Sequence, residues 1–380
     1  MKILLVTEFF PQGRDLKFSG GVEARTYFVA KYLAKIHQVH VIASRQKGLK
    51  RLDVINGIKI HRVGPVLNYS ETASLPEIPN KIMFILSAIK TGVLLKPDIV
   101  DGVNFIAHLI AKQISLKNKI PVVFWYPDVF IGRWTKNSKV AGIFGSLLER
   151  FNFSRSADHF IAISKSTLNK LVKNNVPKKK ISQIYCGVDQ NEFISTVAKN
   201  RHFTIICISR LVSYKRVDHL VKAFSLVSKK SRGIRLILIG SGPEENKLKQ
   251  LCHNLKISNK VNFLKNLKRR DLIKQIKAAQ VFCLPSSVEG FGIATIEAAA
   301  AGLPYIVSDI EIFKEVTKNG QGGLLFKLDD IEDLSKKLEK FISDKNFYKQ
   351  KSDEARKLSL FYDWSKIADQ TEAVYKNLVK

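Results

Sequence analysis

The sequence predicts an α/β protein of two domains, each a doubly wound parallel sheet with helices on both faces. Short runs rich in β-branched residues alternate with longer amphipathic stretches, which is the pattern of βαβ units. The alternation stops at residues 186–201 and then begins again. A length of 380 residues suits two domains. Because ligands of such sheets bind at the carboxyl ends of the strands, we expect the two domains to face each other across a ligand-binding cleft.

The predicted elements alternate in type along both halves of the chain. In the first half we expect strands at 2–7, 38–43, 58–63, 98–101, 120–126 and 159–163, and helices at 22–35, 79–95, 104–116, 141–155 and 165–173. In the second half we expect strands at 203–208, 235–239, 261–263, 281–284, 304–307 and 323–326, and helices at 216–230, 244–256, 270–278, 293–301 and 330–343. A last helix at 365–379 follows a break at 361–364.

The turn-rich segment 186–201 predicts the linker between the domains. We therefore expect a first domain at 1–190, a second at 191–360, and a C-terminal helix within 361–380 that returns to pack on the first domain.

The chain is strongly basic, with 63 Lys and Arg residues against 33 Asp and Glu, a formal net charge of +30. Such an excess calls for an acidic partner: nucleic acid, anionic lipid or a phosphorylated small molecule. The short basic runs 178–180, 229–230 and 268–270 fall in predicted turns, where solvated lysines and arginines are the plainer interpretation. An apolar share of 45% and a charged share of 25% exclude a disordered or collagen-like chain.

Cysteine spacing and hydropathy predict a cytoplasmic protein. The four cysteines stand far apart without a C-x-x-C pair, which argues against a disulfide framework or a zinc site. The apolar stretch 79–96 is interrupted by Lys90 and falls short of an uncharged membrane span. Its flanking lysines leave two interpretations: a buried core helix, which we favour, or a helix lying on an anionic membrane.

Residues 281–304 carry the densest set of candidate site residues. A buried strand ends at residue 284, a polar loop with Ser286 follows, and a helix begins around Gly290 and Gly292. Glycines at a helix start let a ligand approach the free N–H groups, where the helix dipole favours negative charge. Glu289 precedes this helix and Glu297 lies within it, so a phosphate or sugar at the helix start would meet both carboxylates.

Residues 205–218 supply two candidate cations. Arg210 ends a predicted strand, and Lys215 follows where the next helix starts. Both would face the cleft, where a pair of cations suits a diphosphate. Ordinary solvated bases are the alternative, and composition alone favours it.

Two glycine loops also follow predicted strands. Gly20 and Gly21 open the first long helix, and Gly240 and Gly242 precede Pro243, which we place in the first turn of the next helix. Neither loop matches a dinucleotide-binding or P-loop signature. No Asp-x-Asp occurs, so a magnesium site has no evident ligands and we predict no metal.

Together these segments resemble glycosyltransferase family 4, the retaining nucleotide-sugar transferases of the GT-B fold. The resemblance covers nearly the whole chain and is specific as an ordered set. Its motifs are Gly20-Gly21-Val22-Glu23, Ile163-Ser164-Lys165-Ser166, Gly187-Val188-Asp189, Ser209-Arg210-Leu211 with Lys215, Ile239-Gly240-Ser241-Gly242-Pro243, Glu289-Gly290-Phe291-Gly292 with Glu297, Gly302-Leu303-Pro304, Ser308-Asp309 and Glu315.

The resemblance implies catalytic roles. Arg210 and Lys215 would bind the donor diphosphate and neutralise its charge as the nucleotide leaves, and Glu289 would face the donor sugar. Many family members carry a His after the strand that ends here at Tyr126, whereas this chain has Asp128, which we expect to face the acceptor.

The resemblance also implies a set of donor-binding residues. Glu297 would bind the ribose hydroxyls, the N–H groups of Phe291 and Gly292 would hold a phosphate, and Gly21 would let the first domain close on the donor. Relatives often have Gly where Leu264-Lys265-Asn266 stands, so the backbone that binds the base would differ. The remaining expected donor-binding residues are Gly20, Gly240, Gly242, Leu264, Ser286, Gly290 and Ile293.

The implied reaction moves a hexose-type sugar from a UDP- or GDP-type donor to a glycan, lipid-linked or other hydroxyl acceptor. It proceeds by front-face attack, without a metal or another cofactor. A phosphorylase or a nucleotide-sugar epimerase would use the same fold. The net charge of +30 would also suit a nucleic-acid-binding protein. The aromatic residues are not interleaved with the basic runs, however, so we expect no nucleic acid partner.

Overall fold

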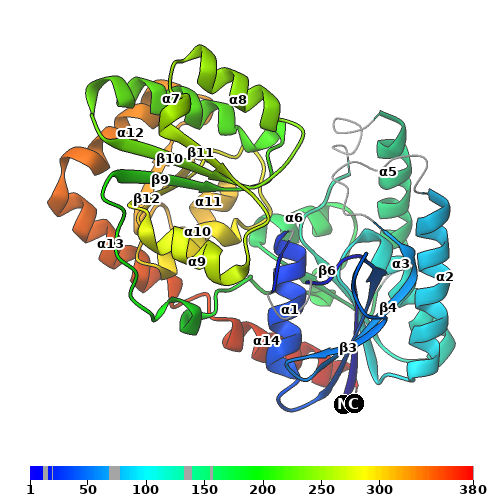
Figure 1. The fold of residues 1–380 in the computed structure, drawn as a ribbon. Helices are drawn as coiled ribbons and strands as arrows, with labels where there is room; N and C mark the ends of the chain where they lie inside the picture. Colours follow the sequence, from blue (N-terminus) through cyan, green and yellow to red (C-terminus); the bar gives the residue numbers. More distant parts are fainter. Residues whose placement is uncertain (12–15, 19, 68–77, 132–138, 155–156, 380) are drawn as a thin grey trace. The chain divides into compact units, whose positions relative to one another are not determined.

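The chain divides into two compact units (Figure 1). The computed structural model describes residues 1–11, 16–18, 20–67, 78–131, 139–154 and 157–379. Unit 1 comprises Met1–Cys186 and Trp364–Lys380, and unit 2 comprises Gly187–Asp363. The first division therefore falls at residue 187 rather than 191. Residues from 187 onward belong to unit 2 because the N–H of Val188 donates to the carbonyl of Tyr362 at 2.6 Å, which joins the two ends of that unit.

Unit 1 is built on a sheet in the order β3-β4-β2-β1-β5-β6-β7-β8. Its strands are β1 (Lys2–Val6), β2 (Gln38–Arg45), β3 (Leu52–Ile55), β4 (Ile58–Val66), β5 (Ile99–Gly102), β6 (Val122–Tyr126), β7 (His159–Ala162) and β8 (Ile181–Gln183). All neighbours pair in parallel except β3 and β4, which form an antiparallel hairpin. Strands β3 and β8 are absent from the predicted elements.

Helices cover both faces of the unit 1 sheet, with α1 and α14 on one side and α2 and α3 on the other (Figure 1). The helices are α1 (Gly21–Leu33), α2 (Ile78–Leu95), α3 (Phe105–Asn118), α5 (Lys139–Ser154), α6 (Lys165–Lys173) and α14 (Trp364–Leu378). Asn104 caps α3, and Ser164 caps α6 through a side-chain oxygen that accepts from the N–H of Thr167. The expectation of a buried core helix at 79–96 is wrong, because only 17% of α2 is buried.

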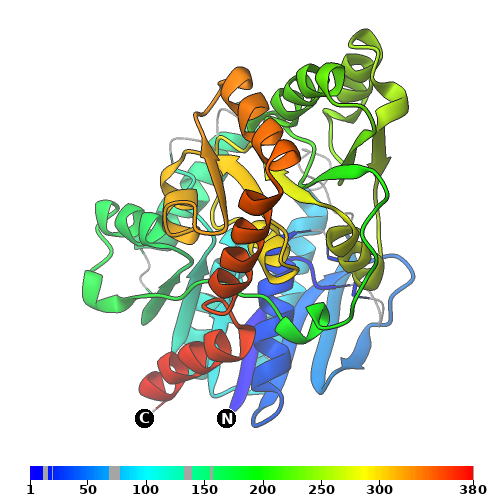
Figure 2. The same cartoon turned by 90° about the vertical axis from the view of Figure 1, so that its left-hand side faces the viewer.

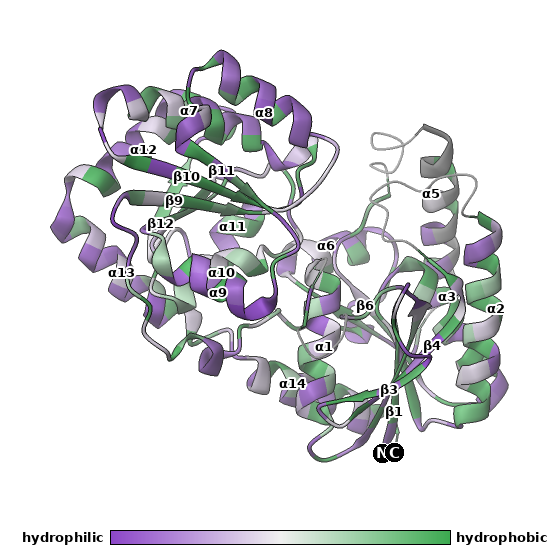
Figure 3. Ribbon diagram, viewed as in Figure 1, coloured by the Kyte–Doolittle hydropathy of each residue, from purple (hydrophilic) through white to green (hydrophobic). Residues whose placement is uncertain are grey.

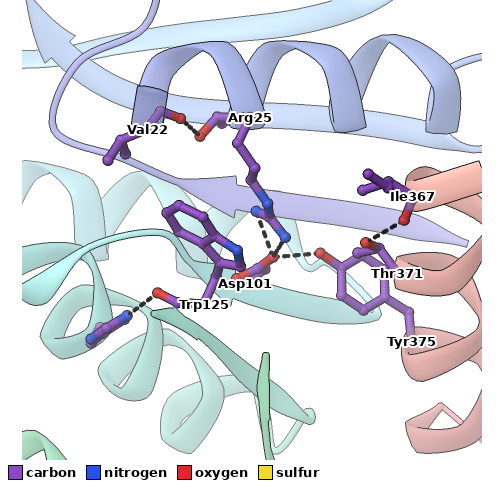
Figure 4. A network of polar contacts seen from close by, with 9 residues as sticks. Val22, Arg25, Asp101, Trp125, Ile367, Thr371 and Tyr375 are labelled. Atoms are coloured by element: carbon purple, nitrogen blue, oxygen red, sulfur yellow. Dashed lines mark hydrogen bonds and ion pairs between the residues drawn. The ribbon is translucent and has the colours of Figure 1, made fainter. Parts of the chain in front are cut away.

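Helix α14 is fixed to unit 1 by a buried polar network (Figure 4). Both terminal nitrogens of Arg25 donate to Oδ2 of Asp101 at 3.1 Å, and the Tyr375 hydroxyl donates to the same oxygen at 2.5 Å. Burial raises the pKa of Asp101, while Arg25 and Tyr375 act to lower it. Alongside this network, the Trp364 ring stacks on Phe28 of α1 at 5.4 Å. The last helix is thus part of the unit 1 core.

Unit 2 is built on a parallel sheet in the order β11-β10-β9-β12-β13-β14. The strands are β9 (Phe203–Ile208), β10 (Ile234–Ile239), β11 (Val261–Leu264), β12 (Val281–Leu284), β13 (Tyr305–Ser308) and β14 (Gly323–Phe326). The helices are α7 (Val217–Lys230), α8 (Glu245–Asn254), α9 (Arg269–Ala278), α10 (Ile293–Ala300), α11 (Glu311–Val316), α12 (Ile331–Ser343) and α13 (Lys345–Ser359).

Helices cover both faces of this sheet as well. Helices α7 and α12 pack together on one face, and α9 and α10 lie on the other (Figure 1). Helix α13 packs along α10 (Figure 2). Short 3-10 turns complete the unit 2 connections at Gln190–Phe193, Ser213–Lys215 and Ser258–Lys260, and another at Lys178–Lys180 lies in unit 1. Helices α11 and α13 are absent from the predicted elements, whereas the predicted α/β class with parallel sheets in two units is confirmed.

Candidate active site

Four neighbouring strands of unit 2 bring the candidate loops to one edge of the sheet. Strands β11, β10, β9 and β12 are adjacent and parallel, so their carboxyl ends meet. The loops that follow them, near 209–216, 240–244, 265–268 and 285–292, carry the predicted donor-side residues. This edge is where ligands of doubly wound sheets bind.

Lys215 and Glu289 form an ion pair at this edge. The Lys215 ammonium donates to Oε1 of Glu289, and the Ser286 hydroxyl donates to the same oxygen at 3.1 Å. The N–H and hydroxyl of Ser287 donate to the carbonyl of Tyr214 at 2.8 and 3.0 Å, which ties the 285–288 loop to the turn that carries Lys215. The structure thus brings together three of the predicted residues, Lys215, Glu289 and Ser286.

Tyr214 connects the two predicted cations. The Arg210 guanidinium donates to the Tyr214 hydroxyl and lies 5.9 Å from the centre of its ring, while the Lys215 ammonium lies 5.5 Å from the same ring. One aromatic ring therefore contacts both cations, which holds two positive charges in one place. Sequence reasoning missed Tyr214, although its position between Arg210 and Lys215 was a signal that it would lie near both.

Helix α10 begins beside this ion pair in the sequence, with Gly292 as its N-cap. Gly292 has φ 83°, and a Cβ placed there would lie 2.8 Å from the Phe313 ring. Phe291 is buried against Tyr362, with ring centres 5.5 Å apart. The helix proper starts at Ile293, one residue after Gly292, so the predicted start near Gly290 and Gly292 is confirmed to within a few residues.

Glu297 lies on α10 in a buried ion pair that sequence reasoning missed. Nη1 of Arg269 is 2.6 Å from Oε1 of Glu297, and Nη2 of Arg269 donates to Oε2 of Glu192 at 2.6 Å. Burial raises the pKa of Glu297, and Arg269 opposes that rise. Burial alone would lower the pKa of Arg269, but the two carboxylates raise it. Glu289 and Glu297 therefore belong to separate ion pairs.

Gly240 and Gly242 are required by the approach of two loops. A Cβ at Gly240 would lie 1.9 Å from the Ser209 carbonyl oxygen, and one at Gly242 would lie 2.3 Å from that of Leu211. Their φ angles of 147° and 157° also favour glycine. The N–H of Gly240 donates to the carbonyl of Leu264 at 2.9 Å, so these predicted donor-binding residues hold the loops that carry Arg210.

One detail near these loops differs from the prediction. Pro243 precedes helix α8, which begins at Glu245, so Pro243 is not in its first turn. Leu264 is the last residue of β11, and the segment whose backbone we expect to bind the base starts there.

The remaining predicted residues lie in unit 1. Gly20 and Gly21 start helix α1, and Gly20 has an extended backbone, φ −175°, that any residue adopts. Asp128 is 3% exposed and its Oδ1 accepts from the N–H of Val129 at 2.8 Å and from the Lys170 ammonium at 2.5 Å. Asp128 is thus an ion-paired carboxylate, a contact that the sequence did not indicate.

Neither a metal-binding cluster nor a disulfide is present among the residues that the structure describes. Within them, no group of three or more His, Cys, Asp or Glu side chains is arranged to hold a metal ion. All four cysteines are described; each is buried and none forms a disulfide there.

Known structures share this architecture. The structure of Anabaena HepE in complex with UDP-glucose superposes with a TM-score of 0.79 at 18% identity, covering 100% of both chains. A sucrose-phosphate synthase from Thermosynechococcus elongatus gives a TM-score of 0.83 at 16% identity, covering 99% of this chain and 98% of that one. Both comparisons show that the chain has the GT-B fold of two α/β units.

The chain belongs to the glycosyltransferases. Residues 188–358 match the family described as Glycosyl transferases group 1, and residues 19–192 match Glycosyltransferase Family 4. A glycosyltransferase of Haemophilus influenzae is 32% identical over 59% of this chain and 67% of its own length. One of Methanocaldococcus jannaschii is 26% identical over 99% of this chain and 98% of its own.

Proposed function

We propose that the chain transfers a hexose-type sugar from a nucleoside diphosphate donor, of UDP or GDP type, to a hydroxyl of a saccharide acceptor. The observation that carries this proposal is the cluster of Arg210, Tyr214, Lys215 and Glu289 at the strand ends of unit 2. The fold neighbour that holds UDP-glucose supports a donor of this class.

The two cations stabilise the departing diphosphate in this proposal. An ammonium has three N–H bonds, and the contact with Glu289 uses one of them, so Lys215 retains donors for phosphate oxygens. Arg210 adds a second, permanently charged donor. Negative charge on the diphosphate grows as the bond to the sugar breaks, so these cations stabilise the transition state more than the bound donor.

The two carboxylates orient the sugar and the nucleoside. Lys215 and Ser286 both contact Oε1 of Glu289 and so fix this carboxylate at the strand ends of unit 2, where we propose that the donor sugar binds. Arg269 contacts Oε1 of Glu297, and we propose that Oε2 accepts hydrogen bonds from the ribose hydroxyls. The phosphate is held at the start of α10, by the N–H groups of Phe291 and Gly292.

The stereochemistry, metal requirement and acceptor are parts of the same proposal. We propose front-face attack with retention of the anomeric configuration and without a metal or another cofactor. Asp128, with Lys170, acts on the acceptor side. A lipid-phosphate-linked saccharide is the acceptor class that suits the charge of +30, and we place the protein at the cytoplasmic face of a membrane.

Two substitutions test the assignment. Lys215→Ala and Glu289→Ala should abolish sugar transfer while the protein stays folded, and Lys222→Ala should not. Lys222 is a suitable control because it forms an exposed pair with Asp218 on the helix that follows. Full activity of both site variants would refute the assignment.

Ligand and product measurements test the finer points. Thermal-shift measurements with UDP, GDP and their sugars should identify the donor, because a bound ligand stabilises the folded state. Release of nucleoside diphosphate only with acceptor present excludes an epimerase or a phosphorylase. The anomeric proton of the product reports retention, and activity that survives EDTA supports a metal-free reaction.

A further inference from the structure

One face of helix α2 packs on the rest of unit 1. Its buried positions are Phe84, Ala88 and Gly92. A Cβ placed at Gly92 would lie 2.2 Å from the Ile114 side chain, and one at Gly64 of β4 would lie 2.8 Å from the Phe84 backbone. The inner face of α2 therefore packs closely against α3 and β4, and the partly buried Ile85 and Ile89 add to this contact with the core.

The opposite face of α2 exposes large apolar residues. Ile82, Met83, Leu86 and Leu94 are 51, 56, 63 and 72% exposed. Positions 82, 86, 90 and 94 follow each other four residues apart, so they form one stripe along the helix. Figure 3 shows hydrophobic residues along α2, on the outside of unit 1. Several exposed apolar residues gathered on one helix face indicate a docking surface, whereas isolated exposed apolar residues do not.

The charged residues of α2 itself and of its neighbour α3 are all basic. Residues 78–97 contain Lys81, Lys90 and Lys96 and no acidic residue, and the neighbouring helix α3 contains Lys112 and Lys117 and no acidic residue. Lys81 pairs with Glu8, whereas Lys90 stands within the apolar stripe itself. Lysines interspersed with large apolar residues are the composition that binds anionic lipid.

A second copy of the chain fits this face less well. Two α2 helices packed face to face would place like-charged lysines against each other, and neither α2 nor α3 offers a carboxylate to pair with them. Anionic lipid headgroups supply the complementary charge, and acyl chains supply the apolar contact.

The inner contacts of α2 argue against a helix that crosses the membrane. The helix is long and apolar enough to cross a bilayer. However, crossing would remove Phe84, Ala88 and Gly92 from their contacts with α3 and β4. We propose that the outer face of α2, namely Ile82, Met83, Leu86, Lys90 and Leu94, docks the protein in the plane of an anionic lipid bilayer. This builds on the membrane location proposed above and names the surface responsible.

Vesicle binding by the full chain tests the docking face. Sedimentation with vesicles of phosphatidylcholine alone should recover little protein. Vesicles with about a third phosphatidylglycerol should bind it, and raised salt should weaken that binding because it screens the lysines. Leu86→Glu should lower the binding constant about tenfold or more, since it places a carboxylate in the apolar contact. Ile36→Glu is the matched control, because Ile36 is 65% exposed in the turn after α1.

Three results would overturn the proposal. These are equal binding to both vesicle types, no binding to either, or an equal effect of the two substitutions. A dimer in light-scattering measurements that Leu86→Glu dissociates would instead assign this face to a second copy. Vesicle binding needs neither donor nor acceptor, so its outcome is separate from that of the sugar-transfer assay.

Discussion

Arg269→Met should destabilise unit 2 strongly, because Arg269 is the cation that Glu192 and Glu297 share. The side chains of Arg269 and Glu297 are each 8% exposed, and that of Glu192 is 18% exposed. Removing one partner of a buried ion pair leaves an uncompensated charge and costs about 3–5 kcal/mol. In urea, with a slope of about 3 kcal/mol/M, this loss lowers the unfolding midpoint by about 1 M or more.

The matched control is Arg270→Met, which makes the same change one residue later, at an exposed position of the same helix. Urea unfolding followed by circular dichroism compares the two variants with the wild type. Arg269→Met should unfold at clearly lower urea, and Arg270→Met should match the wild type. The double variant Arg269→Met/Glu297→Gln should recover part of the loss, because it removes the carboxylate left without a cation.

Equal midpoints for Arg269→Met and Arg270→Met would refute the reasoning. So would a double variant less stable than Arg269→Met alone. The same variants bear on the donor site. If Arg269 orients Glu297, Arg269→Met should raise KM for the donor, and it should add little to KM once Glu297 is already Gln.

Three further predictions concern the rest of the fold. Gly240→Ala should lower the thermal stability by about 1–3 kcal/mol, because its Cβ would meet the Ser209 carbonyl at 1.9 Å; an unchanged Tm would contradict this. Tyr375→Phe should cost about 1–3 kcal/mol in urea unfolding, since Asp101 loses a buried donor; wild-type stability would exclude it. Burial, with a neighbouring imidazole, lowers the pKa of His40 to about 4 from 6.5. The unfolded chain then binds a proton below pH 6.5 that the folded chain does not, so His40 alone should lower the stability by about 2 kcal/mol between pH 7 and 5. Burial also lowers the pKa of His108, to about 3, so His40→Phe should remove only the His40 part of the slope.

Strands that are buried on both faces were predictable, because continuous apolar runs mark them. The edge strand β3 was not, since Leu52 and Val54 are 67 and 62% exposed. The Asn56-Gly57 pair that closes its hairpin was the available signal, and both residues have positive φ. Helix α13 was missed because its residues are polar on most sides and few of them, among them Ala355 and Leu358, are buried.

The candidate site could also be predicted only in part from the sequence. Arg210, Lys215, Glu289 and Glu297 were predicted as site residues through an ordered set of motifs. Arg269 was not, because a basic run in a sequence has the composition of a solvated turn. Only the packing of α9 against α10 and the 190–193 turn shows that this one arginine is buried between two acids.

The buried contacts of α14 determine which unit can complete its folding first during synthesis. Unit 2 is continuous in sequence, so a ribosome supplies all of it by Asp363. Synthesis of unit 1 begins first. However, the hydrogen bond from Tyr375 to Asp101 and the stacking of Trp364 on Phe28 cannot form until the last helix has been synthesised. Domains generally complete their folding in the order of synthesis. Here the unit that starts the chain is the last to be finished, and its unfinished core must remain soluble while the other unit folds.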